Sequence, residues 1–309
     1  MTYPKRIPIN AWNDTFRVAK PLIVTFDAYN TLYATKLPVM EQYCIVGRKY
    51  GIKTTPSTLT KNFPHVFKKL KEDYPQYGKH SNIKPEEWWS LLIRNVFVPI
   101  EIPDEMIDEI LMRFEGFDSY FVYPDLIEFL SNLKSRYPNI ILGIISNTDP
   151  TFYKLLKNIG LYETFADSIY LSYELDLIKP DRAMFQYALD DIIRKNSHLL
   201  KMYSREEILQ HSFHIGDELK NDLEGAQAAG WTGILLDRSD KYGYLSESVG
   251  KASRDEYKLS IDKIDNHSMK TWEASTKQKD TVQLSERKYV VSNFEVLEEL
   301  FSLNAELFQ

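Results

Sequence analysis

The chain has 309 residues, of which 43% are hydrophobic and 27% are charged, and its formal net charge is −6. This composition is ordinary for a soluble globular protein and excludes global disorder. The acidic balance offers no basic footprint, so no nucleic-acid partner is expected. No stretch approaches the roughly 20 apolar residues of a membrane span, so none is predicted. Cys44 is the single cysteine, which excludes an internal disulfide and a cysteine metal cluster and suits a reducing compartment.

The first 20 residues mix basic side chains with Asp14 and two prolines and contain no apolar run of the kind that secretion signals carry. As a mitochondrial presequence the stretch is weak. We therefore expect residues 1–20 to form a lead-in to the fold. Cytoplasmic residence is the default expectation, while mitochondrial and nuclear residence stay open.

Apolar runs of strand length recur along the chain, and each ends in a small or acidic residue. Amphipathic helical patterns separate them. This alternation is typical of a parallel sheet with helices on both faces, so we predict an α/β fold with a Rossmann-like core. Ligands bind at the carboxyl ends of the strands in such sheets. The runs are 22–26 before Asp27, 140–145 before Ser146, 212–215 before Gly216 and Asp217, and 233–236 before Asp237.

Residues 36–118 differ from this pattern, because they show helical periodicity, many aromatic residues and no clear strand. Pro85 followed by two glutamates is typical of a helix start. We predict an all-helical cap inserted after the first strand, since insertions of this kind commonly act as lids over strand ends. The core is then expected to comprise residues 21–35, 119–238 and 289–309.

Residues 239–288 are polar, with scattered lysine, aspartate, serine and threonine. We expect a surface extension with partial order here. The apolar pattern returns at residues 289–301, which are predicted to pack back on the core as a short strand or a terminal helix.

Four groups of polar residues are each predicted to stand at a strand end. An aspartate such as Asp27 can attack phosphorus to form an acyl phosphate, and a fixed cation such as Lys179 can neutralise the transferring group. Two carboxylates at a turn suit Mg²⁺. Each group alone has an ordinary structural explanation, as a helix N-cap, an exposed lysine or a turn; four in order on one sheet are hard to obtain by accident. The groups are Asp27 with Thr31, Ser146 with Asn147, Lys179 in Ile-Lys-Pro-Asp, and Asp217 with Asp222.

This order resembles the four motifs of the haloacid dehalogenase-like hydrolase superfamily, and the resemblance spans about residues 21–236. Within the predicted cap, Tyr-Pro-Gln-Tyr-Gly at 74–78, followed by Glu87-Trp88-Trp89 and Phe97, is similar to one subgroup. That subgroup is the haloacid dehalogenase-like hydrolase domain-containing protein 3 family, including its fungal members. The resemblance implies a Rossmann-like core with a helical cap inserted after the first motif.

The resemblance also implies roles for the motif residues. Asp27 would be the nucleophile that is phosphorylated, and Mg²⁺ would bridge it to the phosphate of a small phosphorylated molecule. Asp217 would be the direct acidic ligand, Asp222 would support it, and the main-chain carbonyl of Tyr29 would also face the metal. The phosphate would be held by Thr31, Ser146, Asn147 and Lys179.

Tyr29 departs from the phosphatase pattern, which places an aspartate there as general acid and base. Positioned proton transfer is typically worth about 10² to 10⁴ in rate. A phenol with an ordinary pKa near 10 is a poor base at neutral pH, although it can donate a hydrogen bond. We therefore expect weak turnover. Asp149 is a nearby acid that could substitute, but the sequence does not place it.

Two alternatives stay open at this stage. One is a catalytically impaired scaffold that binds Mg²⁺ and a phosphorylated ligand or a protein partner. The other is a metal-free 2-haloacid dehalogenase, because Asp-Ala-Tyr-Asn-Thr resembles the first motif Asp-x-Tyr-Gly-Thr of those enzymes. Asp217 argues against it, since its charge would repel a carboxylate substrate. Arg48 is the nearest candidate for the cap arginine of dehalogenases, and Phe185 stands where they tend to carry a tyrosine.

The remaining titratable and aromatic residues have structural interpretations. His214 is predicted to be a core histidine whose hydrogen bonds are satisfied, and His65 and His80 lie in the cap without partners that the sequence identifies. Trp88 and Trp89 are predicted to belong to the cap core, with one of them open to the active-site cleft.

Overall fold

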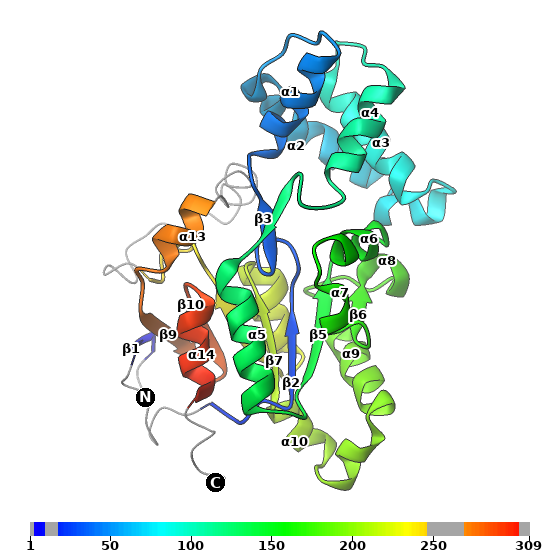
Figure 1. The fold of residues 1–309 in the computed structure, drawn as a ribbon. Helices are drawn as coiled ribbons and strands as arrows, with labels where there is room; N and C mark the ends of the chain where they lie inside the picture. The colour runs from blue at the N-terminus through cyan, green and yellow to red at the C-terminus, as the bar shows by residue number, and fades with distance from the viewer. Residues whose placement is uncertain (1–2, 10–17, 246–268, 303–309) are drawn as a thin grey trace.

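The computed structural model describes residues 3–9, 18–245 and 269–302 (Figure 1). Its centre is an eight-stranded sheet in the order β1-β9-β10-β8-β7-β2-β5-β6. Neighbouring strands from β10 to β6 are parallel, which confirms the predicted α/β, Rossmann-like core. The strands are β1 (Lys5–Pro8), β2 (Ile23–Phe26), β5 (Ile141–Ser146), β6 (Ile169–Leu171), β7 (Ser212–Gly216), β8 (Thr232–Leu236), β9 (Asp280–Ser285) and β10 (Lys288–Val291).

Helices cover both faces of the parallel strands, as Figure 1 shows for α5 and α14 on the near face. All four residues of β2 are buried, and Val24 and Phe26 pack with α5 and α14, whereas Ile23 packs with helices of the far face. This alternation explains the continuous apolar run, because a central parallel strand buries both of its sides. The near-face helices are α5 (Pro124–Arg136), α6 (Thr151–Asn158), α7 (Tyr162–Phe165) and α14 (Phe294–Ser302). The far-face helices are α9 (Arg182–Lys195), α10 (Arg205–Gln210) and α11 (Gly225–Ala228).

A helical cap lies beyond the carboxyl ends of the strands and has its own apolar core around Trp88 (Figure 1). The chain enters it through β3 (Tyr33–Thr35) and leaves through β4 (Tyr120–Val122), which pair with each other as antiparallel strands. The inserted cap is therefore present, while its boundaries at 36 and 118 stay a prediction. Its elements are α1 (Val39–Lys49), α2 (Pro56–Asp73), η1 (Gln76–Ser81), α3 (Pro85–Phe97) and α4 (Asp104–Arg113).

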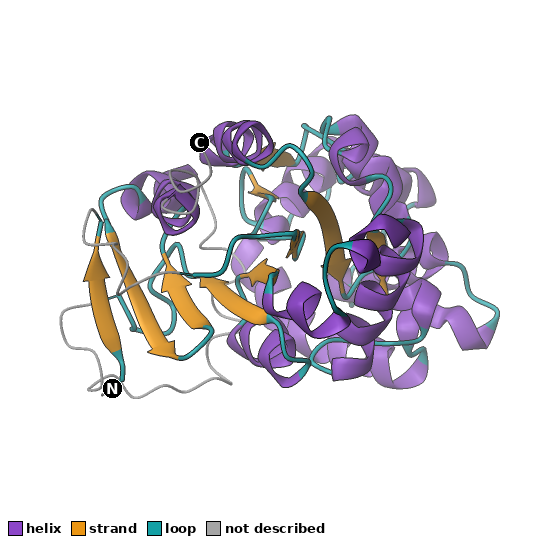
Figure 2. Cartoon of the chain, turned by 90° about the horizontal axis from the view of Figure 1, so that it is seen from below, coloured by secondary structure: helices purple, strands orange, loops and turns teal. Residues whose placement is uncertain are grey.

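The edge of the sheet next to the N-terminus differs from the sequence expectation. β1 comes from the predicted lead-in and β9 from the predicted polar extension, yet both are strands of the main sheet. β9 is antiparallel to both of its neighbours. An antiparallel part of a sheet can keep one face in water, which explains the polar sequence of β9. Figure 2 shows these strands fanning out at one side while most helices gather at the other. Residues 246–268 of the predicted extension, like 303–309 of the predicted core, lie outside the described residues.

The remaining short helices connect these layers. No helix in the described parts of the chain is both long enough and apolar enough to cross a membrane. The connecting helices are α8 (Ser172–Leu175), η2 (Ser197–Lys201), η3 (Leu219–Glu224) and α13 (Met269–Ser275).

Candidate active site at the carboxyl ends of the central strands

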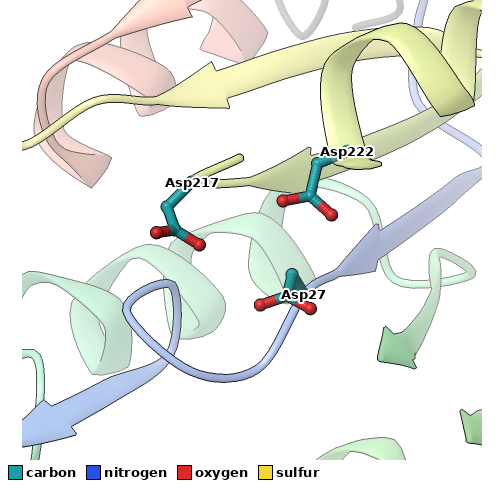
Figure 3. A group of neighbouring side chains, drawn as sticks. All are labelled: Asp27, Asp217 and Asp222. Carbon is teal, nitrogen blue, oxygen red and sulfur yellow. The ribbon is translucent and has the colours of Figure 1, made fainter. Parts of the chain in front are cut away.

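Three carboxylates converge where β2 and β7 end. Asp27 directly follows β2, Asp217 directly follows β7, and Asp222 lies in η3 just after it. Because β2 and β7 are parallel neighbours, their carboxyl ends meet at one edge of the sheet. Figure 3 shows the three side chains pointing toward one another, and one oxygen from each lies within 4.8 Å of the other two.

Lys179 joins two of these carboxylates. Its ammonium nitrogen lies 2.6 Å from Oδ1 of Asp27 and 2.6 Å from Oδ1 of Asp222, and its side chain is 2% exposed. The Glu218 main-chain N–H donates to the other oxygen of Asp222 at 2.9 Å. Burial alone would raise the pKa of Asp222, but Lys179 and His214 outweigh it and hold the pKa well below its ordinary value. Asp222 is thus an ionised carboxylate whose oxygens are already bound by protein donors.

Gly216 makes this arrangement sterically feasible. A Cβ at this position would lie 2.2 Å from Cγ of Asp222, closer than any real contact. Only glycine therefore lets η3 bring Asp222 against the end of β7. The Gly-Asp pair at the strand end is accordingly a requirement for close packing as well as a turn.

The carboxylates of Asp27 and Asp217 have fewer hydrogen-bond donors and cations around them than the carboxylate of Asp222. Burial raises the pKa of Asp27 to about 7 despite the nearby Lys179. Burial, followed by the charges of Glu218 and Asp27, raises the pKa of Asp217 well above its ordinary value. Within the described residues, the single hydrogen bond to the Asp217 carboxylate is a long one, 3.5 Å from Nδ2 of Asn30. Asp217 therefore lacks the donors that a buried carboxylate needs.

The charge balance of this group fits a divalent cation. When all three carboxyl groups are ionised, they and the one ammonium leave two uncompensated negative charges among Asp27, Asp217, Asp222 and Lys179. Mg²⁺ prefers carboxylate and carbonyl oxygens and commonly takes only one or two carboxylates from the protein. Asp27 and Asp217 offer oxygens that are not all bound by protein donors, whereas Asp222 holds Lys179. The donor set thus has the chemistry that a magnesium ion requires.

His214 is a site neighbour whose role the sequence did not reveal. It is completely buried in β7, and burial lowers its pKa to about 4, so it is neutral at pH 7. Because ionised Asp222 can only accept, Nε2 of His214 must donate to it, at 3.2 Å, and Nδ1 then accepts from the Thr25 hydroxyl at 2.9 Å. Thr25 and His214 are register partners on β2 and β7. The interpretation of His214 as a hydrogen-bonded core histidine agrees with these contacts, but the sequence did not show that η3 folds back on β7 to bring Asp222 to it.

The predicted phosphate-binding residues occupy different environments. Ser146 ends β5 and is 5% exposed, and its hydroxyl has no hydrogen-bond partner in the described part of the chain. The side chain of Asn147 instead binds the main chain of Lys179, accepting from its N–H at 2.8 Å and donating to its carbonyl at 3.0 Å. Thr31 is wholly buried, and its hydroxyl finds no partner among the described residues. Ser146 is the one of the three best placed to meet a phosphoryl oxygen.

Tyr29 lies two residues after Asp27, at the base of the cap connection. Its ring centroid is 5.9 Å from that of Tyr33 and 6.4 Å from that of Tyr120, which belong to β3 and β4. Its hydroxyl is 3.5 Å from Oγ1 of Thr35, the outer limit of a hydrogen bond. The phenol therefore packs in an aromatic cluster on the two strands that carry the cap.

Asp149, the predicted substitute acid, is buried and already bound at both oxygens. Oδ2 accepts from the indole N–H of Trp89 at 2.9 Å, and Oδ1 accepts from the main-chain N–H of Thr151 at 2.9 Å. Trp88 is 1% exposed in the cap core, whereas Trp89 is partly exposed and reaches the core domain. Trp88 thus packs inside the cap, whereas Trp89 contributes to the contact between cap and core.

The residues considered for a dehalogenase do not join this group. Arg48 is exposed in the last turn of α1 and, among the described residues, forms no ion pair with the site. Phe185 is buried in α9 with its ring edge-to-face against His214, 5.0 Å between centroids. His65 is exposed on α2, and His80 has a partner that the sequence did not identify, Oδ1 of Asp176 at 2.9 Å.

Comparison with known proteins agrees with this architecture. The family described as haloacid dehalogenase-like hydrolase matches residues 22–230. An uncharacterized protein of Saccharomyces cerevisiae is 82% identical over 301 residues, which cover 97% of this chain and 100% of that protein. Haloacid dehalogenase-like hydrolase domain-containing protein 3 of Mus musculus is 25% identical over 221 residues, covering 71% of this chain and 82% of the relative.

Among solved structures, L-2-haloacid dehalogenase from Xanthobacter autotrophicus is similar in fold, with a TM-score of 0.52 and 15% sequence identity over 91% of this chain and 98% of that one. At that identity the similarity speaks for the fold alone. The matched residues 22–230 include all four predicted motifs, and the relatives include a member of the subgroup that the cap sequence indicated. The chain therefore belongs to the haloacid dehalogenase-like hydrolase family.

Proposed function

We propose that this protein is a magnesium-dependent phosphatase-type hydrolase that acts slowly on a small phosphorylated molecule. The observation that carries the proposal is the position of Asp27, 2.6 Å from Lys179 and beside the poorly compensated Asp217. Such a group has a nucleophile, a fixed cation and an excess of two negative charges. It suits phosphoryl transfer better than any other reaction that a strand-end aspartate supports.

In this proposal, one carboxylate oxygen of Asp27 attacks phosphorus, the bond from phosphorus to the ester oxygen breaks as the aspartyl phosphate forms, and the departing alcohol takes its proton from solvent. Water then attacks the aspartyl phosphate, which releases inorganic phosphate and restores the Asp27 carboxylate. Lys179 neutralises charge on both the nucleophile and the phosphoryl oxygens, and the Ser146 hydroxyl donates to one of those oxygens. Asp27, Asp217 and the Tyr29 carbonyl would hold Mg²⁺, with Asp222 supporting through Lys179. The metal, when bound, supplies positive charge for the phosphoryl oxygens.

Tyr29 is expected to make the second half of the reaction slow. Hydrolysis of the aspartyl phosphate needs a base for the attacking water, and a phenol is a poor one at neutral pH. The likeness to phosphatases therefore predicts a rate lower by about 10² to 10⁴ than that of an enzyme with a positioned carboxylate.

The single cysteine, Cys44, is buried and unpaired, which supports residence in a reducing compartment such as the cytoplasm.

The test compares four proteins on a panel of phosphomonoesters with and without Mg²⁺: the parent chain, Tyr29→Asp, Tyr29→Phe and Asp27→Asn. We expect Tyr29→Asp to gain magnesium-dependent activity, Tyr29→Phe to gain none, and Asp27→Asn to lose what the parent has. Tyr29→Phe is the matched control, because it removes the hydroxyl without adding an acid. If Tyr29→Asp stays silent on every substrate, the phosphatase proposal fails.

A second candidate function is a scaffold that binds Mg²⁺ and a phosphorylated ligand or a protein partner without turnover. The observation that favours it is the phenol of Tyr29, packed among Tyr33 and Tyr120 where proton transfer is needed. Calorimetric Mg²⁺ binding that Asp217→Asn abolishes, together with a silent Tyr29→Asp, would favour the scaffold. Halide release from 2-haloacids without metal would instead favour a dehalogenase.

A further inference from the structure

The cap touches the core through a turn with an unusual backbone. Gln76, Tyr77 and Gly78 are consecutive in η1 and have φ angles of 50°, 55° and 82°, all in the left-handed region. Two of the three are not glycine, and such residues are disfavoured there unless the surroundings fix them. The Tyr77 ring packs against Trp88 and Trp89, with centroids 5.2 and 5.8 Å away. The strained turn therefore places the Tyr77 side chain at a defined position.

The first contact made by this turn is with the loop after β5. The Tyr77 hydroxyl donates to the main-chain carbonyl of Asn147 at 3.0 Å. Two residues further on, Asp149 accepts from the Trp89 indole at 2.9 Å. Both contacts join the cap to the core, and both fall on residues 147–149. The cap thus holds this loop at two points.

The second contact is with α8 and the residue that follows it. Lys79 donates to the Tyr173 carbonyl at 2.5 Å and lies 2.7 Å from Oδ2 of Asp176. The main-chain N–H of Tyr173 donates in turn to the carbonyl of Thr148 at 3.2 Å, so α8 is tied to the loop after β5. Asp176 precedes Lys179 by three residues. The same cap turn therefore contacts both the loop after β5 and the segment 173–176 that precedes Lys179.

Asn147 completes the connection to the reacting groups. Its side-chain amide binds both the N–H and the carbonyl of Lys179, at 2.8 and 3.0 Å, while the Lys179 ammonium lies 2.6 Å from Asp27. We propose that Tyr77 and Asn147 are positioning residues that make the placement of Lys179 against Asp27 depend on docking of the cap. An undocked cap leaves the Asn147 loop without its Tyr77 and Trp89 contacts, and Lys179 is then held less firmly.

Hydrogen exchange at the Lys179 amide tests this coupling directly, because that N–H donates to Asn147. Exchange is measured at residue resolution in the full chain for the parent, Tyr77→Phe, Trp89→Phe and Asn147→Ala. One lost hydrogen bond is worth about 0.5–1.5 kcal/mol, so we expect Tyr77→Phe to speed exchange at Lys179 about two- to tenfold. Asn147→Ala, which removes the acceptor itself, is expected to exceed that.

Tyr50→Phe is the matched control, since the Tyr50 hydroxyl donates to Glu105 and Glu109 inside the cap. It removes a tyrosine hydroxyl from the same domain without touching the core, so exchange at Lys179 should not change. If Asn147→Ala does not fold, Trp89→Phe provides the second variant. The coupling is wrong if Tyr77→Phe and Trp89→Phe both leave Lys179 exchange at the parent rate, or if Tyr50→Phe raises it as much.

A kinetic measurement adds the functional consequence, and this arm alone rests on the proposed phosphatase activity. In the Tyr29→Asp background, Tyr77→Phe should lower kcat more than it raises KM, because the charge that Lys179 neutralises is greatest in the transition state. Faster exchange in a protein without phosphatase activity supports the coupling and contradicts only the proposed function. Unchanged exchange in an active phosphatase contradicts only the coupling.

Discussion

The ammonium of Lys179 and the carboxylate of Asp222 form an ion pair removed from water, with Nζ 2.6 Å from Oδ1 and side chains 2% and 1% exposed. Removing one partner of such a pair leaves an uncompensated charge, which typically costs about 3–5 kcal/mol. We expect Lys179→Met to lower the free energy of unfolding by that amount in urea titrations with a chelator present.

The control for Lys179→Met is Lys69→Met, which breaks an ion pair of the same type on the surface of α2. Lys69 lies 3.0 Å from Asp73, but the two side chains are 64% and 45% exposed. Surface pairs contribute little, so the unfolding midpoint should hardly move. Equal losses in the two variants would show that burial of the Lys179 pair is energetically unimportant.

Gly216→Ala is predicted to disrupt the site through sterics alone. The new Cβ would lie 2.2 Å from Cγ of Asp222, so Asp222 must move away from Lys179. Overpacking of this kind costs about 1–3 kcal/mol, and Mg²⁺ binding should weaken at the same time. In Gly47→Ala, the matched change in α1, the new Cβ would lie 3.3 Å from the flexible end of Met106, and the free energy of unfolding should stay within about 1 kcal/mol of the parent. Calorimetry with Mg²⁺ and urea unfolding distinguish the two variants.

Magnesium binding is predicted to release protons near neutral pH. Burial raises the pKa of Asp27 to about 7, so this carboxyl is largely protonated below that pH in the metal-free protein. A cation must displace the proton, and the apparent Mg²⁺ affinity should therefore rise as the pH increases through 7. Titration calorimetry in buffers with different ionisation enthalpies measures the proton release directly. Asp27→Asn should reduce the release to the part that comes from Asp217, whose pKa is also raised by burial, and a pH-independent affinity would contradict the prediction.

Asp237, which follows β8, gives a pH dependence that is separate from the metal site. Burial raises its pKa to about 6 although the main-chain N–H groups of Tyr242 and Lys241 donate to it. Between about pH 4 and 6 the folded state keeps this proton while the unfolded state has lost it, so the stabilisation is present below pH 4 and disappears as the pH rises through 6. The stability of the parent relative to Asp237→Asn should fall over this range and stay constant above pH 7, as measured by urea unfolding at each pH.

Much of the site could be predicted from the sequence because ligands bind at the carboxyl ends of the strands in a parallel sheet. Asp27, Ser146 and Asp217 each follow a continuous apolar run, and parallel strands bring such positions to one edge whatever their separation in the chain. Lys179 was predicted only through its place in the order of motifs. Its 2.6 Å distances to Asp27 and Asp222 depend on the packing of η3 against β7, which leaves no local signal beyond Gly216.

The features that the sequence did not reveal depend on tertiary contacts. His214 reaches Asp222 because η3 folds back against β7, and it reaches Thr25 because β7 lies next to β2. Neither that packing nor the strand order is written in any one segment. Tyr77 contacts Asn147 because a left-handed turn directs its side chain from the cap toward the core. Gln76 and Tyr77 adopt this turn although neither residue type favours it. β9 resembled a loop because its alternating polar residues suit an antiparallel strand with one face toward water.

β9 and β10 cover the edge of β8 and so keep it from pairing with strands of other molecules. β8 is buried at all five positions and pairs with β10, which in turn pairs with β9. The family match ends at residue 230, before all three strands. A chain cut just after β8 would present an apolar strand of five residues with unpaired N–H and carbonyl groups, the kind of surface that templates aggregation. The hairpin of β9 and β10 therefore keeps this apolar edge covered, and a form of the protein shortened before it is expected to aggregate.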